Sequence, residues 1–191
     1  NFTNPNDVGF DHFYGYVNMW HAHNFYPEFL IRNGKVEPLK NVVEASWKEF
    51  QDPKLPQGGR GVAETKVQYA PDLFIEDALR FIRENRQGPF FLYFAMNVPH
   101  ANNEAGKAGM EVPDFGEFAD KDWPEPEIGF AAMIRNIDRD CGRIIDLLQQ
   151  LKIDKQTLVI FTSDNGPHAE GGHDPDFFDS NGPLRGIKRD L

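Results

Sequence analysis

Two apolar runs, each following a long amphipathic segment, constrain the fold of this chain most strongly. PFFLYFAM (89–96) and TLVIFTS (157–163) have strand length and a continuous apolar centre, as is typical of strands buried on both faces. The segments before them, about 70–86 and about 125–151, carry apolar residues at helical spacing and predict helices. This alternation predicts an α/β fold with a mostly parallel sheet flanked by helices.

The two predicted helices have recognisable limits and faces. Pro71 suits a first helical turn, and Gln87-Gly88-Pro89 ends the first helix. The second helix has an apolar stripe that includes Cys141, and we expect this cysteine to be an inert core residue. Because Cys141 is the one cysteine of the chain, an internal disulfide is excluded. The stripe consists of Ile134, Ile137, Cys141, Ile144, Ile145 and Leu148.

The remaining sequence predicts a hairpin and long irregular stretches. Asn33-Gly34 lies between two short apolar segments, and both residues tolerate the positive φ of a tight hairpin turn. The aromatic, histidine-bearing region 1–30 and the Pro- and Gly-rich stretches 51–64 and 97–124 predict loops.

Composition narrows the class of protein. The chain has 191 residues, of which 40% are hydrophobic, and this suffices for one domain with a substantial core. A net charge of -10 argues against nucleic acid as a partner. No apolar run approaches the roughly 20 residues that span a bilayer. Because the chain starts without Met and stops within an apparent element, we expect it to be a piece of a longer protein.

Polar residues follow both predicted strands. His100 comes shortly after the first strand, and Asp164-Asn165 come directly after the second. Parallel strands end at a common edge, where ligands bind in open α/β sheets. A carboxylate and an amide oxygen are hard ligands that suit Ca²⁺ or Mg²⁺, and they need further ligands from elsewhere. The alternative is an ordinary turn at Asp164-Asn165-Gly166.

Other polar residues have weaker signals. Arg185 and Lys188 form either a solvated basic patch or an anion site beside the cation. We expect His168 to contact a substrate, with a solvated loop histidine as the alternative. His21 and His23 could share a face as metal ligands, but their aromatic surroundings favour packing.

Four stretches together resemble the type I sulfatases, the arylsulfatase-like enzymes of the alkaline-phosphatase-like superfamily. GFDHFYGY…AHNFYP, FFLYFAMNVPH, TLVIFTSDNGPH and NGPLRGIK occur in the family's order and spread over essentially the whole chain. The resemblance implies that residues 1–191 are the central part of a sulfatase catalytic domain, without its amino-terminal nucleophile segment or carboxy-terminal subdomain. It also implies a sulfated small molecule or glycan as substrate and a periplasmic or secreted location.

The resemblance assigns roles to individual positions. Asp164 and Asn165 match a pair of calcium ligands, and the family's other pair would precede residue 1. His100 matches the histidine that contacts sulfate, and Lys188 matches the lysine between the sulfate and the leaving oxygen. The resemblance therefore implies that His100 and Lys188 are catalytic. The expectation that Arg185 and His168 contact substrate rests on the residues alone.

One element of the family is missing. Type I sulfatases use a formylglycine made within a C/S-x-P-x-R motif, and neither Cys141 nor Ser180 lies in such a motif. We expect the isolated chain to be inactive and the missing flanks to supply the nucleophile. The alternatives are a phosphodiesterase or phosphatase of the same superfamily, and a non-catalytic carbohydrate-binding fragment.

Overall fold

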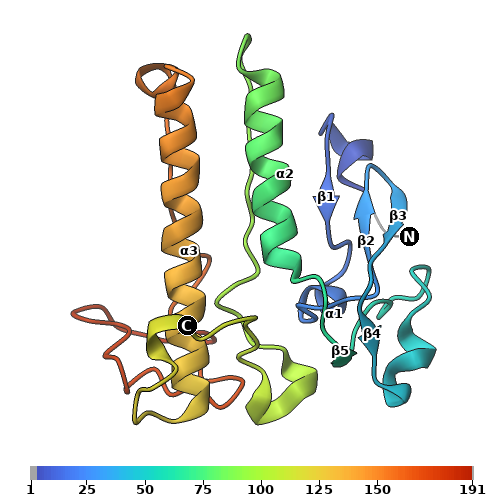
Figure 1. The fold of residues 1–191 in the computed structure, drawn as a ribbon, viewed down its shortest axis with the longest axis vertical. Coiled ribbons are helices and arrows are strands. Elements are labelled where there is room, and N and C mark those ends of the chain that lie inside the picture. Colours follow the sequence, from blue (N-terminus) through green and yellow to red (C-terminus); the bar gives the residue numbers. More distant parts are fainter. Residues whose placement is uncertain (1–3, 191) are drawn as a thin grey trace. The chain divides into compact units, whose positions relative to one another are not determined.

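Both long helices lie where the sequence predicts them, α2 at Ala70–Asn85 and α3 at Glu125–Gln150 (Figure 1). The structure, a computed structural model, describes residues 4–190. Within this range the chain divides into two units: unit 1 comprises residues 4–77 and 102–105, and unit 2 comprises residues 78–101 and 106–190. The boundary falls within α2, so each half of this helix belongs to a different unit.

Unit 1 is built on an antiparallel sheet of three strands in the order β1-β2-β3. These strands are Tyr14–Gly15, Phe29–Arg32 and Lys35–Pro38. Asn33 and Gly34 join β2 to β3 with φ of 48° and 76°, which confirms the predicted hairpin. The first half of α2 packs on this sheet through Phe74, whose ring lies edge-on to Tyr14 and Tyr16 at centroid distances of 5.7 and 5.2 Å.

The rest of unit 1 is mostly irregular, as expected. It contains short elements only: η1 (Pro5–Val8), α1 (Met19–Ala22), β4 (Val42–Val43), η2 (Ala45–Phe50) and β5 (Ala63–Thr65), with β4 antiparallel to β5. His21 and His23 are both buried here, and the His21 ring packs against Tyr16 and Phe29. The packing interpretation of this histidine pair is therefore confirmed for His21.

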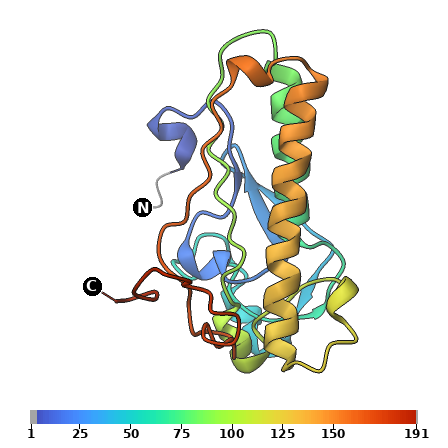
Figure 2. The ribbon, with the colours of Figure 1, turned by 90° about the vertical axis from the view of Figure 1, so that its left-hand side faces the viewer.

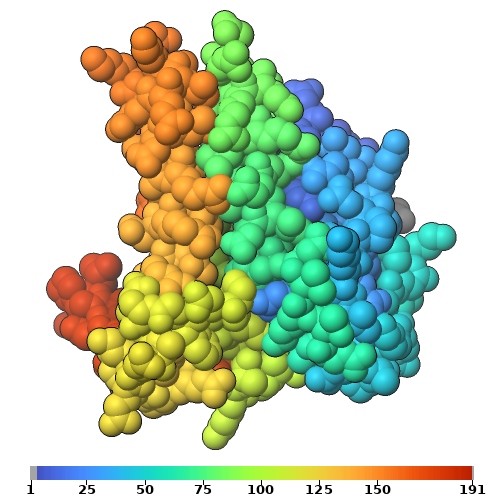
Figure 3. Space-filling model, in the orientation of Figure 1, coloured from blue at the N-terminus to red at the C-terminus, as the bar shows by residue number. Residues whose placement is uncertain are grey.

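Unit 2 is organised around α3 and the second half of α2. Three short helices complete the described elements: η3 (Asn103–Ala108, which begins in unit 1), η4 (Gly116–Phe118) and η5 (Asp154–Gln156). Arg135 of α3 holds the 106–124 loop by donating to the carbonyl oxygens of Asp114 and Phe115 and to the Glu117 carboxylate. This loop, yellow in Figure 3, covers the first turns of α3.

The buried face of α3 differs from the predicted stripe. Ile137 and Leu148 are buried as predicted, but Ile134 is 43% exposed and Ile145 37% exposed. Cys141 is a free, half-buried thiol whose pKa burial raises, together with the nearby Asp140 and Asp138. The residues that α3 does bury are concentrated in its first half, close to the loops described below.

The two predicted strands are extended but form no strand pairs among the described residues. Both 90–96 and 157–163 lie on the same side of α3 (Figure 2). Alternate side chains of the first segment are exposed, Phe91 by 74% and Tyr93 by 71%, while the Phe90 ring packs on Phe81. Leu158, Ile160 and Phe161 are 70–84% exposed. The prediction of burial on both faces is wrong for this chain, because burial needs neighbouring strands and a second covering layer.

No helix in the described part of the chain is long and apolar enough to cross a membrane.

Candidate active site

The structure brings His100 and Lys188 together from positions 88 residues apart. The Lys188 Nζ lies 2.7 Å from His100 Nε2, and both side chains are partly buried. His100 follows the 90–96 segment, and the backbone N–H of Lys188 donates to the Pro167 carbonyl oxygen at 2.8 Å. The segment after 157–163 therefore fixes the position of Lys188 through the backbone, independently of its ammonium group.

The hydrogen bonds of His100 define its tautomer. Its Nδ1 lies 2.7 Å from the Ala101 carbonyl oxygen, which can only accept, so Nδ1 carries the proton. In the neutral ring Nε2 is then a lone-pair acceptor, and the Lys188 ammonium donates to it. Lys188 is consequently the cationic donor of this pair, and His100 orients it.

Glu170 completes the cluster. Its Oε2 lies 3.0 Å from Lys188 Nζ and 3.5 Å from His100 Nε2, and its Oε1 accepts from Arg189. The side chain is 13% exposed, whereas that of Arg189 is 76% exposed. Burial acts to raise the pKa of the Glu170 carboxyl, but the hydrogen bond and charge of Lys188, with His100 and Arg189, lower it below its ordinary value. A carboxylate thus lies against both groups.

Two glycines allow Glu170 to reach this position. Gly171 and Gly172 have φ of 65° and 84°, which disfavours residues with a Cβ. A Cβ on Gly171 would lie 2.6 Å from the Ala101 Cβ and 3.0 Å from the Met110 sulfur. The sequence EGGH therefore makes a tight turn that packs directly beside the residue following His100.

A buried carboxylate anchors the other end of this turn. Glu127, in the first turn of α3, accepts from the Asp174 backbone N–H at 2.7 Å, and its Oε2 lies 2.7 Å from His173 Nδ1. The Glu127 and His173 side chains are 2% and 0% exposed. The Phe130 ring stacks on His173 with a centroid distance of 3.8 Å. Glu127 and Phe130 together attach the 166–174 loop to α3.

His168 is tied into the same loop by both ring nitrogens. Its Nε2 lies 2.8 Å from the Pro99 carbonyl oxygen and therefore carries the proton, while Nδ1 accepts from the Glu170 backbone N–H. Burial lowers the pKa of His168, so the ring stays neutral. This geometry positions Glu170 beside His100; the substrate contact expected of His168 stays a prediction.

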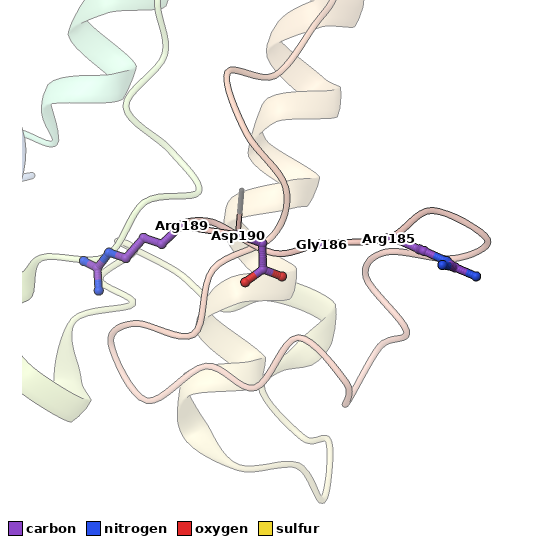
Figure 4. A pocket seen from close by; sticks show the side chains of 4 residues that line it. All are labelled: Arg185, Gly186, Arg189 and Asp190. Carbon is purple, nitrogen blue, oxygen red and sulfur yellow. The ribbon is translucent and has the colours of Figure 1, made fainter.

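Arg185 lies in the irregular segment 181–190. Together with Gly186, Arg189 and Asp190 it lines an open surface pocket, in which the side chains of Arg185 and Arg189 point in opposite directions (Figure 4). Arg189 is the arginine that reaches Glu170. Of the two basic residues singled out at this end of the sequence, the structure brings Lys188, rather than Arg185, to His100.

Asp164 and Asn165 are exposed and lie at the end of the extended 157–163 segment, three and two residues before Pro167. Their donor set, a carboxylate and a carboxamide, fits a hard cation such as Ca²⁺. The described residues contain no group of three His, Cys, Asp or Glu arranged to hold a metal. The pair thus fits part of a calcium shell and needs ligands from outside it.

Sequence reasoning missed Glu170 and Glu127, the two acids that organise the site. The available signal was local: Glu170 lies between two histidines and precedes two glycines, and Glu127 directly precedes the apolar run 128–134 of the predicted helix. Such acids are usually solvated, and only the fold reveals that both are buried or nearly so.

Comparison with known proteins gives one family. The model of the Sulfatase family matches residues 1–191. The chain is 39% identical over 119 residues to the N-acetylgalactosamine-6-sulfatase of Rattus norvegicus, covering 59% of this chain and 19% of the relative. It is 32% identical over 117 residues to the steryl-sulfatase of Mus musculus and 30% identical over 105 residues to arylsulfatase H of Homo sapiens, covering 59% and 55% of this chain. The chain spans less than a fifth of each relative's length: 19% of the first and 16% of the other two.

Proposed function

Because this chain belongs to the sulfatase family, we propose that it forms the central part of a sulfuric ester hydrolase. The observation that carries the proposal is the contact between His100 and Lys188 at 2.7 Å, with Lys188 as the donor. A sulfate ester needs a cationic donor where negative charge grows on the sulfuryl and ester oxygens as the S–O bond breaks. Lys188, held by His100 and by its own backbone, is such a donor.

The role of each residue follows from its chemistry. The Lys188 ammonium stabilises the departing oxygen and is the group that can give it a proton. His100 in its neutral tautomer accepts from Lys188 and keeps the ammonium oriented; when protonated, it donates to a sulfuryl oxygen. The nucleophile, a formylglycine in this family, is proposed to come from the flanking sequence.

The metal proposal rests on Asp164 and Asn165. They would supply two oxygen ligands to a Ca²⁺ ion, with Mg²⁺ as the alternative, and flanking residues would supply the others. A bound divalent cation would offset the negative charge of the sulfuryl group. In a protein that contains the complete domain, Asp164→Ala is expected to weaken Ca²⁺ binding at least about tenfold, since one charged ligand is lost. Calorimetric titration of the chelator-treated protein measures this, with the exposed Asp154→Ala as the matched control; equal affinities in both variants would remove Asp164 from the metal shell.

We further propose that 90–96 and 157–163 become strands of a mostly parallel sheet once the flanking sequence is present. The exposed alternate side chains of 90–96 support this, because they leave one apolar face uncovered. A sulfated carbohydrate is the proposed substrate class, supported by a relative named N-acetylgalactosamine-6-sulfatase. The periplasmic or secreted location stays a prediction.

The decisive experiment is a comparison of ester substrates in a protein containing the complete domain. Hydrolysis of 4-nitrophenyl sulfate should exceed that of 4-nitrophenyl phosphate, and Lys188→Ala should lower sulfate release about 100-fold, the typical effect of removing one preorganised donor. Lys155→Ala, which removes a lysine at the exposed η5 helix, is the matched control and should leave turnover unchanged. Faster phosphate hydrolysis would favour the phosphatase alternative, and unchanged turnover in Lys188→Ala would refute the role of Lys188.

A further inference from the structure

The carboxylate of Glu170 lies where an anionic substrate group is expected. Its Oε2 contacts Lys188 Nζ at 3.0 Å and lies 3.5 Å from His100 Nε2, the two groups proposed above to bind sulfate. A carboxylate oxygen and a sulfate oxygen make the same demand on the Lys188 ammonium. Two anions placed against one ammonium group also repel each other strongly in a partly desolvated site.

We propose that Glu170 is a resident counter-ion of the sulfate position: its carboxylate occupies the anion's place beside Lys188 and His100 in the free protein and leaves it when sulfate binds. This inference rests on the proposed function, because it takes the sulfate position to lie at Lys188 and His100. It gives Glu170 a specific effect on affinity, since an incoming anion must displace a carboxylate that already neutralises the site.

The surroundings of Glu170 provide a route for this displacement. Its backbone is fixed, because its N–H donates to His168 Nδ1 and its carbonyl oxygen accepts from the His173 N–H. The displacement that we propose is a rotation of the Glu170 side chain about its own bonds, during which Oε1 keeps its contact with Arg189. Because Arg189 is 76% exposed, the carboxylate can turn outward while keeping this partner. The loop need not move, since only the side chain changes its rotamer.

The counter-ion also explains how the free site tolerates its positive charge. Without Glu170, the Lys188 ammonium and the Arg189 guanidinium would both lose the carboxylate that each of them contacts. The lowered pKa of the Glu170 carboxyl ensures that it is ionised at neutral pH and available for this role.

The test measures the binding of inorganic sulfate to the 191-residue chain and to Glu170→Gln, by calorimetry at constant ionic strength. Glutamine keeps the size and an acceptor oxygen but loses the charge, so the variant should bind sulfate about tenfold more tightly. Glu117→Gln is the matched control, since Glu117 is an exposed acid that pairs with Arg135 elsewhere in unit 2. A positioning role for Glu170 alone would instead weaken sulfate binding.

A second measurement uses the unaltered chain and does not depend on the folding of the variant. The pKa of the Glu170 carboxyl, followed by ¹³C NMR, should rise when sulfate saturates the site, because the carboxylate loses Lys188 and gains a neighbouring anion. Any of three results would overturn the inference: a Glu170 pKa that is unchanged at saturation, sulfate binding by Glu170→Gln that is weaker than or equal to that of the unaltered chain, or no sulfate binding by either protein. Ester hydrolysis by the complete domain tests the proposed function separately: phosphate specificity there would refute the sulfatase proposal without changing the sulfate-binding result.

Discussion

Acidification should destabilise unit 1 through a single buried histidine, His21. Its side chain is fully buried, and its Nε2 carries a proton that it donates to the Phe29 carbonyl oxygen at 2.9 Å. Its Nδ1 has no hydrogen-bond partner among the described residues. A second proton would therefore create a buried cation with an unpaired N–H, and burial lowers the pKa of His21 from 6.5 to about 4, although the bond to Phe29 opposes this shift.

The sign and size of the effect follow from linkage. Above pH 6.5 both folded and unfolded His21 are neutral, so its contribution to stability is fully present. Between pH 6.5 and about 4 the unfolded chain takes up a proton that the folded chain excludes, and the free energy of unfolding falls. The shift corresponds to a loss of about 3 kcal/mol when pH 4 is reached.

Comparison with His21→Leu isolates this effect from the other titrating groups. Near pH 7 the variant should be about 1–3 kcal/mol less stable, because the buried Phe29 carbonyl oxygen loses its donor. Near pH 4 this deficit should vanish or reverse, since leucine has nothing to protonate. Urea denaturation followed by tryptophan fluorescence gives both free energies, and all other acid effects cancel in their difference. The reasoning would be refuted if the two proteins differed in free energy of unfolding by the same amount at both pH values. It would also be refuted if NMR showed that the folded His21 ring titrates with a midpoint near pH 6.5.

Two further perturbations test how the 166–174 loop is held. Gly171→Ala should lower the free energy of unfolding by about 1–3 kcal/mol, because the new Cβ would clash with Ala101 and the φ of 65° disfavours alanine. Gly142→Ala, in open space within α3, should instead raise the free energy of unfolding by about 0.5–1 kcal/mol. A similar effect of both substitutions would contradict the packing described. Glu127→Ala should cost about 3 kcal/mol in urea denaturation, because the Asp174 N–H and the buried His173 ring lose their acceptor. The exposed Glu125→Ala should cost little. Equal losses would show that Glu127 does not anchor the loop.

Local patterns predicted the local structure of this chain well. The apolar spacing and the Gln87-Gly88-Pro89 stop located α2 within one residue, and Asn33-Gly34 located the β2–β3 turn. Each signal depends on residues close in sequence, where backbone preferences act directly. Burial of the two apolar runs could not be predicted in the same way, because it depends on neighbouring strands that the described residues do not supply.

In the candidate site, too, some residues could be identified from the sequence and others only from the structure. The resemblance singled out His100 and Lys188, and the structure places them in contact. Nothing in the local sequence distinguishes Glu170 from a solvated acid, since its environment is created by Lys188 and Arg189 and by the turn at Gly171. Nor does the local sequence show that both ring nitrogens of His168 are engaged within the protein, and its expected contact with a substrate stays a prediction.

The uncovered apolar face of 90–96 and 157–163 has a consequence for the purified chain. Phe91, Tyr93, Leu158 and Ile160 present aromatic and branched side chains on extended backbone, the combination that favours pairing between separate molecules. Self-association should therefore increase with protein concentration, and light scattering should rise before secondary structure is lost on heating. A lysine in place of Tyr93 would place a charge in the middle of this surface and should keep the chain monomeric at concentrations where the original aggregates.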